Sequence, residues 1–235
     1  MSTTKNSQKI RRMVVLAVFA ALAYVAMLAI HIKVGFLTLD VKDAVITLCG
    51  LYFGPVASLI ISVLVPLLEY ITVSDTREYG LIMNILGSVS FSVTASLIYK
   101  WKKSLTGAIS ALSAGAFVMV GVMLLANLLI TPYYMGVTVA EVKALIPALL
   151  LPFNAIKAVL NVGLVLLLYK HIGTALRKAG FLPRRSVPVE GEKAVSVGKP
   201  TRWRTIFVAL VATALIVGSM LIIFLVLGGN IGFGV

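Results

Sequence analysis

The chain has 235 residues, of which 60% are apolar and only 12% are charged, and its mean hydropathy is +1.05. A soluble protein of this length could not cover so much apolar surface, whereas a lipid bilayer can. The composition therefore excludes a water-soluble enzyme and indicates a multi-pass membrane protein embedded in the lipid bilayer.

The apolar runs predict an all-α fold with seven helices. The second run is too short to cross a bilayer alone, and Gly54-Pro55 separates it from the third, so these two runs are expected to form a bent pair. The chain divides into a six-helix membrane domain (1–178), a polar, basic linker (179–204) and an additional transmembrane helix (205–229). The expected helices lie at 12–30, 41–51, 55–72, 80–99, 106–130, 144–170 and 205–229.

The positions of the basic residues predict the orientation. Sixteen Lys and Arg residues precede the first helix or follow the fourth and sixth, whereas four, Lys33, Lys42, Arg77 and Lys143, fall on the opposite side. The positive-inside rule makes the N-terminus and the linker cytoplasmic and the C-terminus extracellular in a cell membrane. This placement explains the net charge of +13 by topology and contacts with lipid headgroups, so no nucleic-acid partner is expected.

Lys157 lies near the middle of the apolar run 144–169. A charge at such a depth costs roughly 2.5–3.5 kcal/mol, which favours a position inside the protein. Asn154 and Asn161 share its helical face, and Pro152 predicts an irregular turn of the kind that is tolerated beside a cavity. This stripe predicts the wall of a polar cavity. The alternatives are a structural ion pair for Lys157 and helix–helix hydrogen bonds for the asparagines, of which Asn161, being deeper, fits that role better.

Other polar groups are expected at the same depth, near the outer ends of separate elements. They are Glu69 in the third helix, Asn84 in the fourth, Asn127 in the fifth and the loop 34–43. Together with the sixth helix, they predict a cavity that opens outward. Aromatic residues near the same interface could stack on a planar ligand or form an aromatic belt; they are Phe36, Tyr70, Tyr79, Tyr133, Tyr134 and Phe153.

Catalysis is not expected from this sequence. It contains no phosphate-binding loop, so the chain should not hydrolyse ATP. His31 and His171 are predicted on opposite sides of the membrane and cannot share a metal, and the lone Cys49 allows no internal disulfide. The close pair Asp40 and Asp43 falls at a helix start, where Asp43 is expected to cap the second helix. We therefore expect no catalytic residue, metal site or cofactor.

The chain resembles the riboflavin-specific substrate-binding subunits (S components) of energy-coupling factor (ECF) transporters over roughly residues 10–178. The most specific runs are Asn-Leu-Leu-Ile-Thr-Pro-Tyr-Tyr at 127–134 and Pro-Phe-Asn-Ala-Ile-Lys at 152–157. Further similar runs lie at 39–43, 51–55, 83–86 and 95–100.

The resemblance implies a six-helix subunit that captures riboflavin from outside the cell. Such subunits associate with a transmembrane coupling protein and two ATP-binding subunits that hydrolyse ATP, so the subunit itself is not an enzyme. The small residues Ala17 and Ala21 match the family's contact with the coupling protein. By motif position, the implied substrate-binding residues are Thr38, Leu39, Asp40, Asn84, Asn127, Asn154 and Lys157.

The seventh helix departs from this family pattern, which ends after the sixth. Three alternatives stay open beside riboflavin. The ligand could be another vitamin. It could also be the flavin nucleotide FMN, for which Lys33, Lys42 and Lys143 would supply positive charge at the mouth of the cavity. The third alternative is that the protein is a membrane enzyme or a scaffold.

Overall fold

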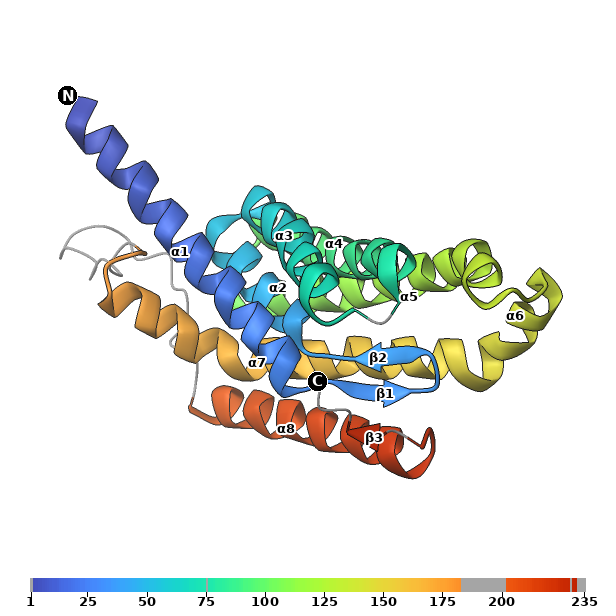
Figure 1. The fold of residues 1–235 in the computed structure, drawn as a ribbon. Coiled ribbons are helices and arrows are strands. Elements are labelled where there is room, and N and C mark those ends of the chain that lie inside the picture. The colour runs from blue at the N-terminus through green and yellow to red at the C-terminus, as the bar shows by residue number, and fades with distance from the viewer. Residues whose placement is uncertain (1, 75, 183–201, 229, 232–235) are drawn as a thin grey trace.

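The computed structural model describes residues 2–74, 76–182, 202–228 and 230–231, so most of the expected linker lies outside the described residues. The expected all-α membrane fold is confirmed, with three short strands added (Figure 1). The elements are α1 (Ser2–Ala29), β1 (Ile32–Val34), β2 (Leu37–Leu39), α2 (Lys42–Phe53), α3 (Pro55–Thr72), α4 (Arg77–Trp101), α5 (Leu105–Met135), α6 (Val139–Leu145), the π-helix η1 (Ile146–Leu150), α7 (Leu151–Lys178), α8 (Arg202–Leu225) and β3 (Asn230–Ile231).

The long helices form one bundle, in which α4 packs against α3 and α5, and α7 packs against α5, α2 and α8. Within the described residues, six helical segments are long and apolar enough to cross a membrane. The short α2 is not one of them, and the expected bent pair is confirmed. Gly54, with φ of 94°, ends α2, and Pro55 begins α3. Glycine adopts this backbone conformation without the steric cost that other residues incur.

The bundle surrounds α2, nine of whose twelve residues are buried. It contacts α1, α3, α4 and α7. A Cβ atom at Gly50 would lie 2.0 Å from Ser96 Oγ on α4 and 2.7 Å from Ser58 Cβ on α3. Only glycine at this position therefore allows α3 and α4 to approach α2 this closely. The consequence for function is that the charged residues at the start of α2, Lys42 and Asp43, lie inside the protein.

The loop expected between the first two helices contains an antiparallel hairpin of β1 and β2. Ile32 pairs with Leu39 and Val34 with Leu37, and β3 pairs with the other edge of β1. The sequence does not predict this sheet, because strands of two or three residues are too short to produce a recognisable alternation. Ile32, Val34 and Leu39 of the hairpin share an apolar cluster with Phe153, Ile156 and Leu160 of α7, so the hairpin packs against α7 (Figure 1).

The sixth expected helix is longer than the sequence predicts. Thr138 and Glu141 form a capping box that starts α6 at Val139, and α7 continues to Lys178. The irregular turn expected near Pro152 is present as the π-helix η1, whose last turn is closed by the amide of Leu151 donating to the carbonyl of Ile146. A π-turn of this kind often occurs beside a functional site.

Two further helix ends differ from expectation. α1 begins at Ser2 rather than near residue 12, because no Gly or Pro interrupts the polar segment before the apolar run. α5 continues through Pro132 and ends at Gly136, which adopts the left-handed conformation typical of helix ends.

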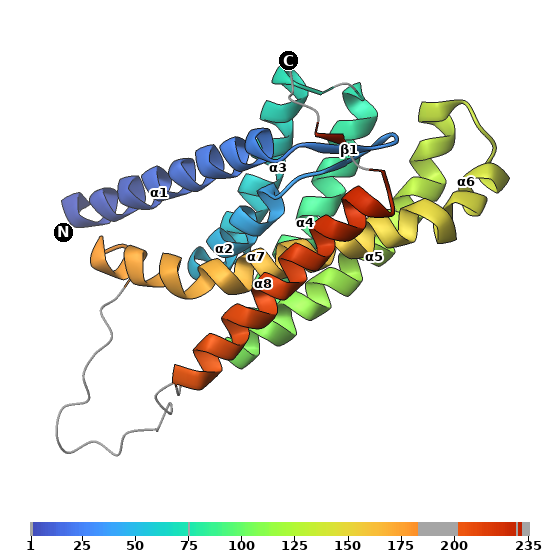
Figure 2. The ribbon, with the colours of Figure 1, turned by 90° about the horizontal axis from the view of Figure 1, so that it is seen from below.

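The additional helix α8 packs along α7, as Figures 1 and 2 both show. The contact depends on a small residue of α7, since a Cβ atom at Gly163 would lie 3.1 Å from the carbonyl oxygen of Ala212. Ala212 and Ile223 of α8 are fully buried, whereas most of the helix is exposed. The seventh helix predicted at 205–229 is therefore present and belongs to the bundle.

Candidate functional site

A cavity of about 240 Å³ lies between the hairpin and the helices α3, α4, α5 and α7. The segment around the hairpin supplies one wall, and the other walls come from the helix ends that lie nearest to it. The polar and charged residues of the lining include Thr38, Asp43, Glu69, Asn84, Asn127, Asn154 and Lys157. Elements far apart in the sequence thus bring their hydrogen-bonding groups to one place, as the sequence predicts.

Five of the seven expected binding residues line the cavity: Thr38, Asn84, Asn127, Asn154 and Lys157. The other two, Leu39 and Asp40, are buried outside the lining. The side chain of Leu39 belongs to an apolar cluster that includes Phe153 and Ile223. Asp40 lies behind the cavity wall, in a cluster of charged groups.

The asparagines of α5 and α7 form hydrogen bonds within their own helices. Asn127 Nδ2 donates to the carbonyl of Met123 at 2.7 Å, and Asn154 Nδ2 donates to that of Leu150 at 2.8 Å. Asn161 Nδ2 likewise donates to the carbonyl of Lys157 at 2.9 Å, and Asn161 Oδ1 has no partner, so Asn161 forms no helix–helix hydrogen bond among the described residues. Asn127 and Asn154 line the cavity, and Asn161 does not.

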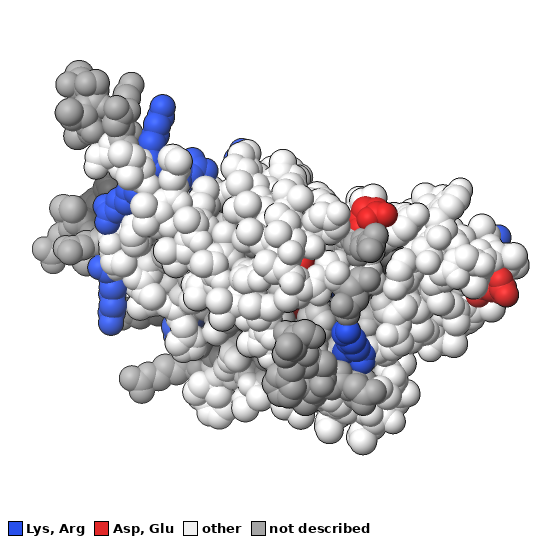
Figure 3. Space-filling view, in the orientation of Figure 1, with Lys and Arg blue, Asp and Glu red and all other residues white. Residues whose placement is uncertain are grey.

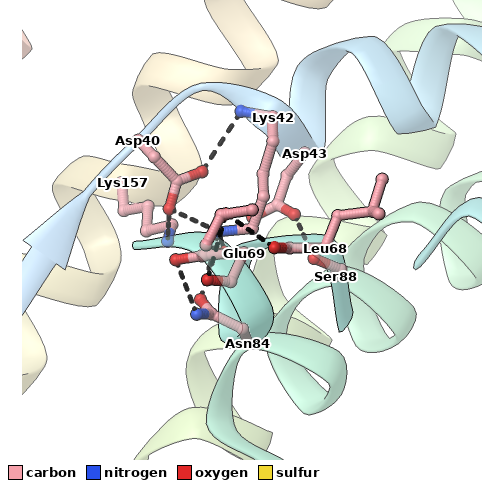
Figure 4. Close-up of polar contacts among 9 residues, drawn as sticks. Asp40, Lys42, Asp43, Leu68, Glu69, Asn84, Ser88 and Lys157 are labelled. Carbon is pink, nitrogen blue, oxygen red and sulfur yellow. Dashed lines mark hydrogen bonds and ion pairs between the residues drawn. The ribbon is translucent and has the colours of Figure 1, made fainter. Parts of the chain in front are cut away.

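Lys42 lies at the centre of a buried charge cluster, drawn in Figure 4. Its side chain is 0% exposed, which corrects the expectation that it lies at the outer mouth. The ammonium lies 2.8 Å from Asp40 Oδ2, 3.0 Å from Glu69 Oε2 and 3.1 Å from Asn84 Oδ1. Asn84 Nδ2 also donates to Glu69 Oε1 at 3.0 Å. The cluster therefore fixes two cavity-lining side chains, those of Glu69 and Asn84.

Lys157 joins the same cluster from α7. Its ammonium lies 2.9 Å from Asp40 Oδ2, the oxygen that also accepts from Lys42. Burial alone would raise the pKa of the Asp40 carboxyl, but the positive charges of Lys157 and Lys42 hold this pKa well below its usual value. Asp40 is therefore ionised. The ion pair considered for Lys157 is present, and the same lysine also lines the cavity.

Asp43 does not cap α2 as the sequence predicts. Val41 occupies the capping position, and Asp43 lies in the first turn, where its carboxylate accepts a hydrogen bond from the Ser88 hydroxyl. Asp43 lines the cavity. The burial of Lys42 and Asp43 is not among the sequence predictions, although a run of three charges within four residues, Asp40 to Asp43, at the start of an apolar helix is a detectable signal.

The aromatic residues divide between the cavity and the outer surface of the bundle. Phe36, Tyr79, Tyr134 and Phe153 line the cavity, and the rings of Tyr79 and Tyr134 lie 6.0 Å apart. Tyr70 and Tyr133 are exposed and do not line it. Ring stacking is thus available to a ligand from four residues, and an aromatic belt is the better interpretation of the other two.

Ala17 and Ala21 are exposed on one face of α1, whereas Ala20 and Ala23 are buried against the bundle. Large apolar side chains, including Val18, surround the exposed alanines. This face is available to lipid or to another membrane helix.

Comparisons with known proteins identify the family of this chain. The family model of the substrate-specific component of ECF transporters matches residues 11–169. The riboflavin transporter RibU of Staphylococcus aureus (strain TCH60) is 31% identical over 182 residues, which cover 74% of this chain and 96% of that protein. A solved S component of a bacterial ECF transporter has a TM-score of 0.60 and 31% identity, over 75% of this chain and 99% of that chain. This multi-pass membrane protein therefore belongs to the family of substrate-specific components of ECF transporters.

Proposed function

We propose that the chain binds riboflavin in this cavity and takes part in its uptake into the cell. The observation that carries the proposal is the lining itself, in which two lysines, Lys33 and Lys157, and three carboxamides lie beside four aromatic rings. The likeness to a protein named as a riboflavin transporter, over most of both chains, supports the same ligand.

The chemistry of riboflavin fits these groups. Its ring system carries carbonyl and ring-nitrogen acceptors, to which Lys157 can donate, and an imide edge that suits the carboxamide of Asn154. Its ribityl hydroxyls both donate and accept, as do the carboxamides of Asn84 and Asn127. The flat ring suits stacking on side chains such as Phe153.

The charges around the cavity favour riboflavin over FMN. A phosphate adds a charge of about −1.5 to −2 at neutral pH, which requires basic partners. Lys42 is buried in ion pairs, and Lys143 is not part of the lining. The carboxylates of Asp43 and Glu69 face the cavity and would repel a phosphate. Of the three lysines that would have favoured FMN, only Lys33 lines the cavity.

Uptake in this proposal requires a transmembrane coupling protein and two ATP-binding subunits, and the chain itself performs no catalysis. The α1 face with Ala17 and Ala21 would contact the coupling protein, because small residues let helices approach closely. The N-terminus would be cytoplasmic and the C-terminus extracellular. In support of this orientation, Figure 3 shows Lys and Arg gathered at the end of the molecule where α1 begins, and Asp and Glu nearer the other end.

Titration of the purified full-length protein with riboflavin, FMN and thiamin side by side tests the proposal. We expect riboflavin to bind most tightly, FMN at least about tenfold more weakly, which is ~1.4 kcal/mol, and thiamin not at all. Protein from riboflavin-containing cells should also be yellow. A colourless protein that binds none of the three would instead favour a membrane enzyme or a scaffold, and preference for thiamin would indicate an S component for another vitamin.

A further inference from the structure

Asp40 occupies an unusual position for a residue so close to the cavity. It is 1% exposed and does not line the cavity, yet its Oδ2 atom accepts from two lysines, Lys42 at 2.8 Å and Lys157 at 2.9 Å. Its other oxygen, Oδ1, accepts from the backbone amide of Lys42 at 3.1 Å. The carboxylate is thus fixed at both oxygens and connects the segment before α2 to α7.

The two lysines bound to Asp40 differ in whether their N–H donors are available to a ligand. An ammonium has three N–H donors. Lys42 is 0% exposed, donates hydrogen bonds to Asp40 and Asn84 and forms an ion pair with Glu69, so it is not available to a ligand. Lys157 is 8% exposed and lines the cavity, and Asp40 is its single acceptor among the described residues. Two of its donors therefore remain available on the cavity side.

We propose that Asp40 is a positioning residue, which holds the ammonium of Lys157 at the cavity wall so that its remaining donors face the ligand. Asp40 itself does not touch the ligand, and Lys42 holds the Asp40 carboxylate in place. This inference rests on the proposed function, in which Lys157 donates to the flavin ring.

The physical advantage is preorganisation. A lysine side chain is long and flexible, so a ligand that had to order it would lose affinity through the entropy of that side chain. The contact with Asp40 orders Lys157 before the ligand arrives. Asp40 thus keeps the ammonium of Lys157 in place at the cavity wall.

A double-mutant cycle separates positioning from general stabilisation of the fold. Riboflavin affinity is measured by quenching of flavin fluorescence for the wild type, Asp40→Asn, Lys157→Met and the double variant, all as full-length protein. We expect Asp40→Asn to weaken binding about tenfold in the presence of Lys157. In the Lys157→Met background it should change affinity by less than about twofold, because the side chain on which Asp40 acts is absent.

The matched control is Glu141→Gln, which removes an exposed carboxylate that does not line the cavity. It should leave affinity unchanged. The positioning role is overturned if Asp40→Asn binds riboflavin like the wild type, or if it weakens binding by the same factor in both backgrounds.

Asp40→Glu covers the case in which the asparagine variant does not fold. It keeps the carboxylate but displaces it, so a positioning role predicts a partial loss of affinity that again disappears in the Lys157→Met background. Wild-type affinity for Asp40→Glu contradicts the inference. A wild-type protein that binds no riboflavin would overturn the proposed function itself, whereas failure of the cycle alone would overturn only the role of Asp40.

Discussion

The helices α7 and α8 lie side by side and are both strongly apolar, yet they differ in what surrounds them. Of the apolar stretch that would cross a membrane, 56% is buried in the segment containing α7 and 17% in α8. The buried face of α7 carries Asn154, Lys157 and Asn161. α8 carries no charged side chain after Arg204, and the hydroxyl of Thr213 bonds to a carbonyl of its own helix. Polar side chains at membrane depth thus occur where protein, rather than lipid, surrounds the helix.

The difference in burial between α7 and α8 indicates which of the two helices contributes to ligand binding. Hydropathy alone identifies α7 and α8 as equivalent spans, but only α7 contributes to the cavity. The family match ends at residue 169, within α7, and does not include α8. We therefore expect substitutions on α7 to change ligand binding and those on the exposed face of α8 to have little effect.

The largest expected effect is a loss of uptake caused by a substitution on the exposed apolar face of α1. The exposed apolar face of α8 serves as the comparison. Ala17→Trp should leave riboflavin binding intact but reduce uptake by cells to the level without the protein. If the α1 face contacts the coupling protein as proposed, a bulky residue at this site would prevent the two from approaching closely. Uptake of labelled riboflavin, with binding measured on the purified variant, checks this outcome.

The control for Ala17→Trp is Leu221→Trp, which places the same side chain on the exposed face of α8. It should leave uptake unchanged. Normal uptake by Ala17→Trp would show that the coupling surface lies elsewhere, and loss of uptake by Leu221→Trp would place α8 in that surface.

The next largest effect is expected for the polar face of α7. Lys157→Ala should weaken riboflavin binding at least about tenfold, because it leaves buried acceptors unpaired at a cost of ~1–3 kcal/mol. Thr213→Ala on α8 removes a polar group of the neighbouring helix and should leave affinity unchanged. Equilibrium titration of both variants checks the contrast. Equal affinities for Lys157→Ala and the wild type would assign Lys157 to the structure alone.

The sequence predicts the α7 site because the signal is local. A lysine and two asparagines at helical spacing within one apolar run are sufficient to identify a polar face, and a proline near them predicts the irregular turn. The spans follow from hydropathy in the same way. Five expected binding residues do line one cavity. Four of them can be assigned a depth from the ends of their own helices, and the fifth, Thr38, lies in the loop that the sequence places on the same side.

The parts that the sequence does not predict depend on contacts between distant segments. Lys42 follows a loop that the sequence places outside, which predicts a position at the mouth of the cavity. The start of α2 instead lies within the bundle, so Lys42 is buried. Its partner Glu69 lies on α3, and Lys157, the second partner of Asp40, lies on α7. No local pattern pairs these residues. Figure 4 shows them converging from separate elements.

The smallest effect is expected at the contact between α7 and α8. Gly163→Leu places a side chain against the Ala212 carbonyl, where even a Cβ atom would lie at 3.1 Å and would also lie 3.1 Å from Ile216 Cγ1. Overpacking of this kind costs ~1–3 kcal/mol, which should lower the thermal midpoint by a few degrees while changing riboflavin affinity less than Lys157→Ala does. Gly218→Leu on α8, where a Cβ atom meets no other atom within 4 Å, is the matched control and should keep the wild-type midpoint. If Gly163→Leu instead weakens riboflavin binding as strongly as Lys157→Ala does, the packing of α8 against α7 is needed for the cavity. The conclusion that α7 contributes to ligand binding and α8 does not would then be wrong.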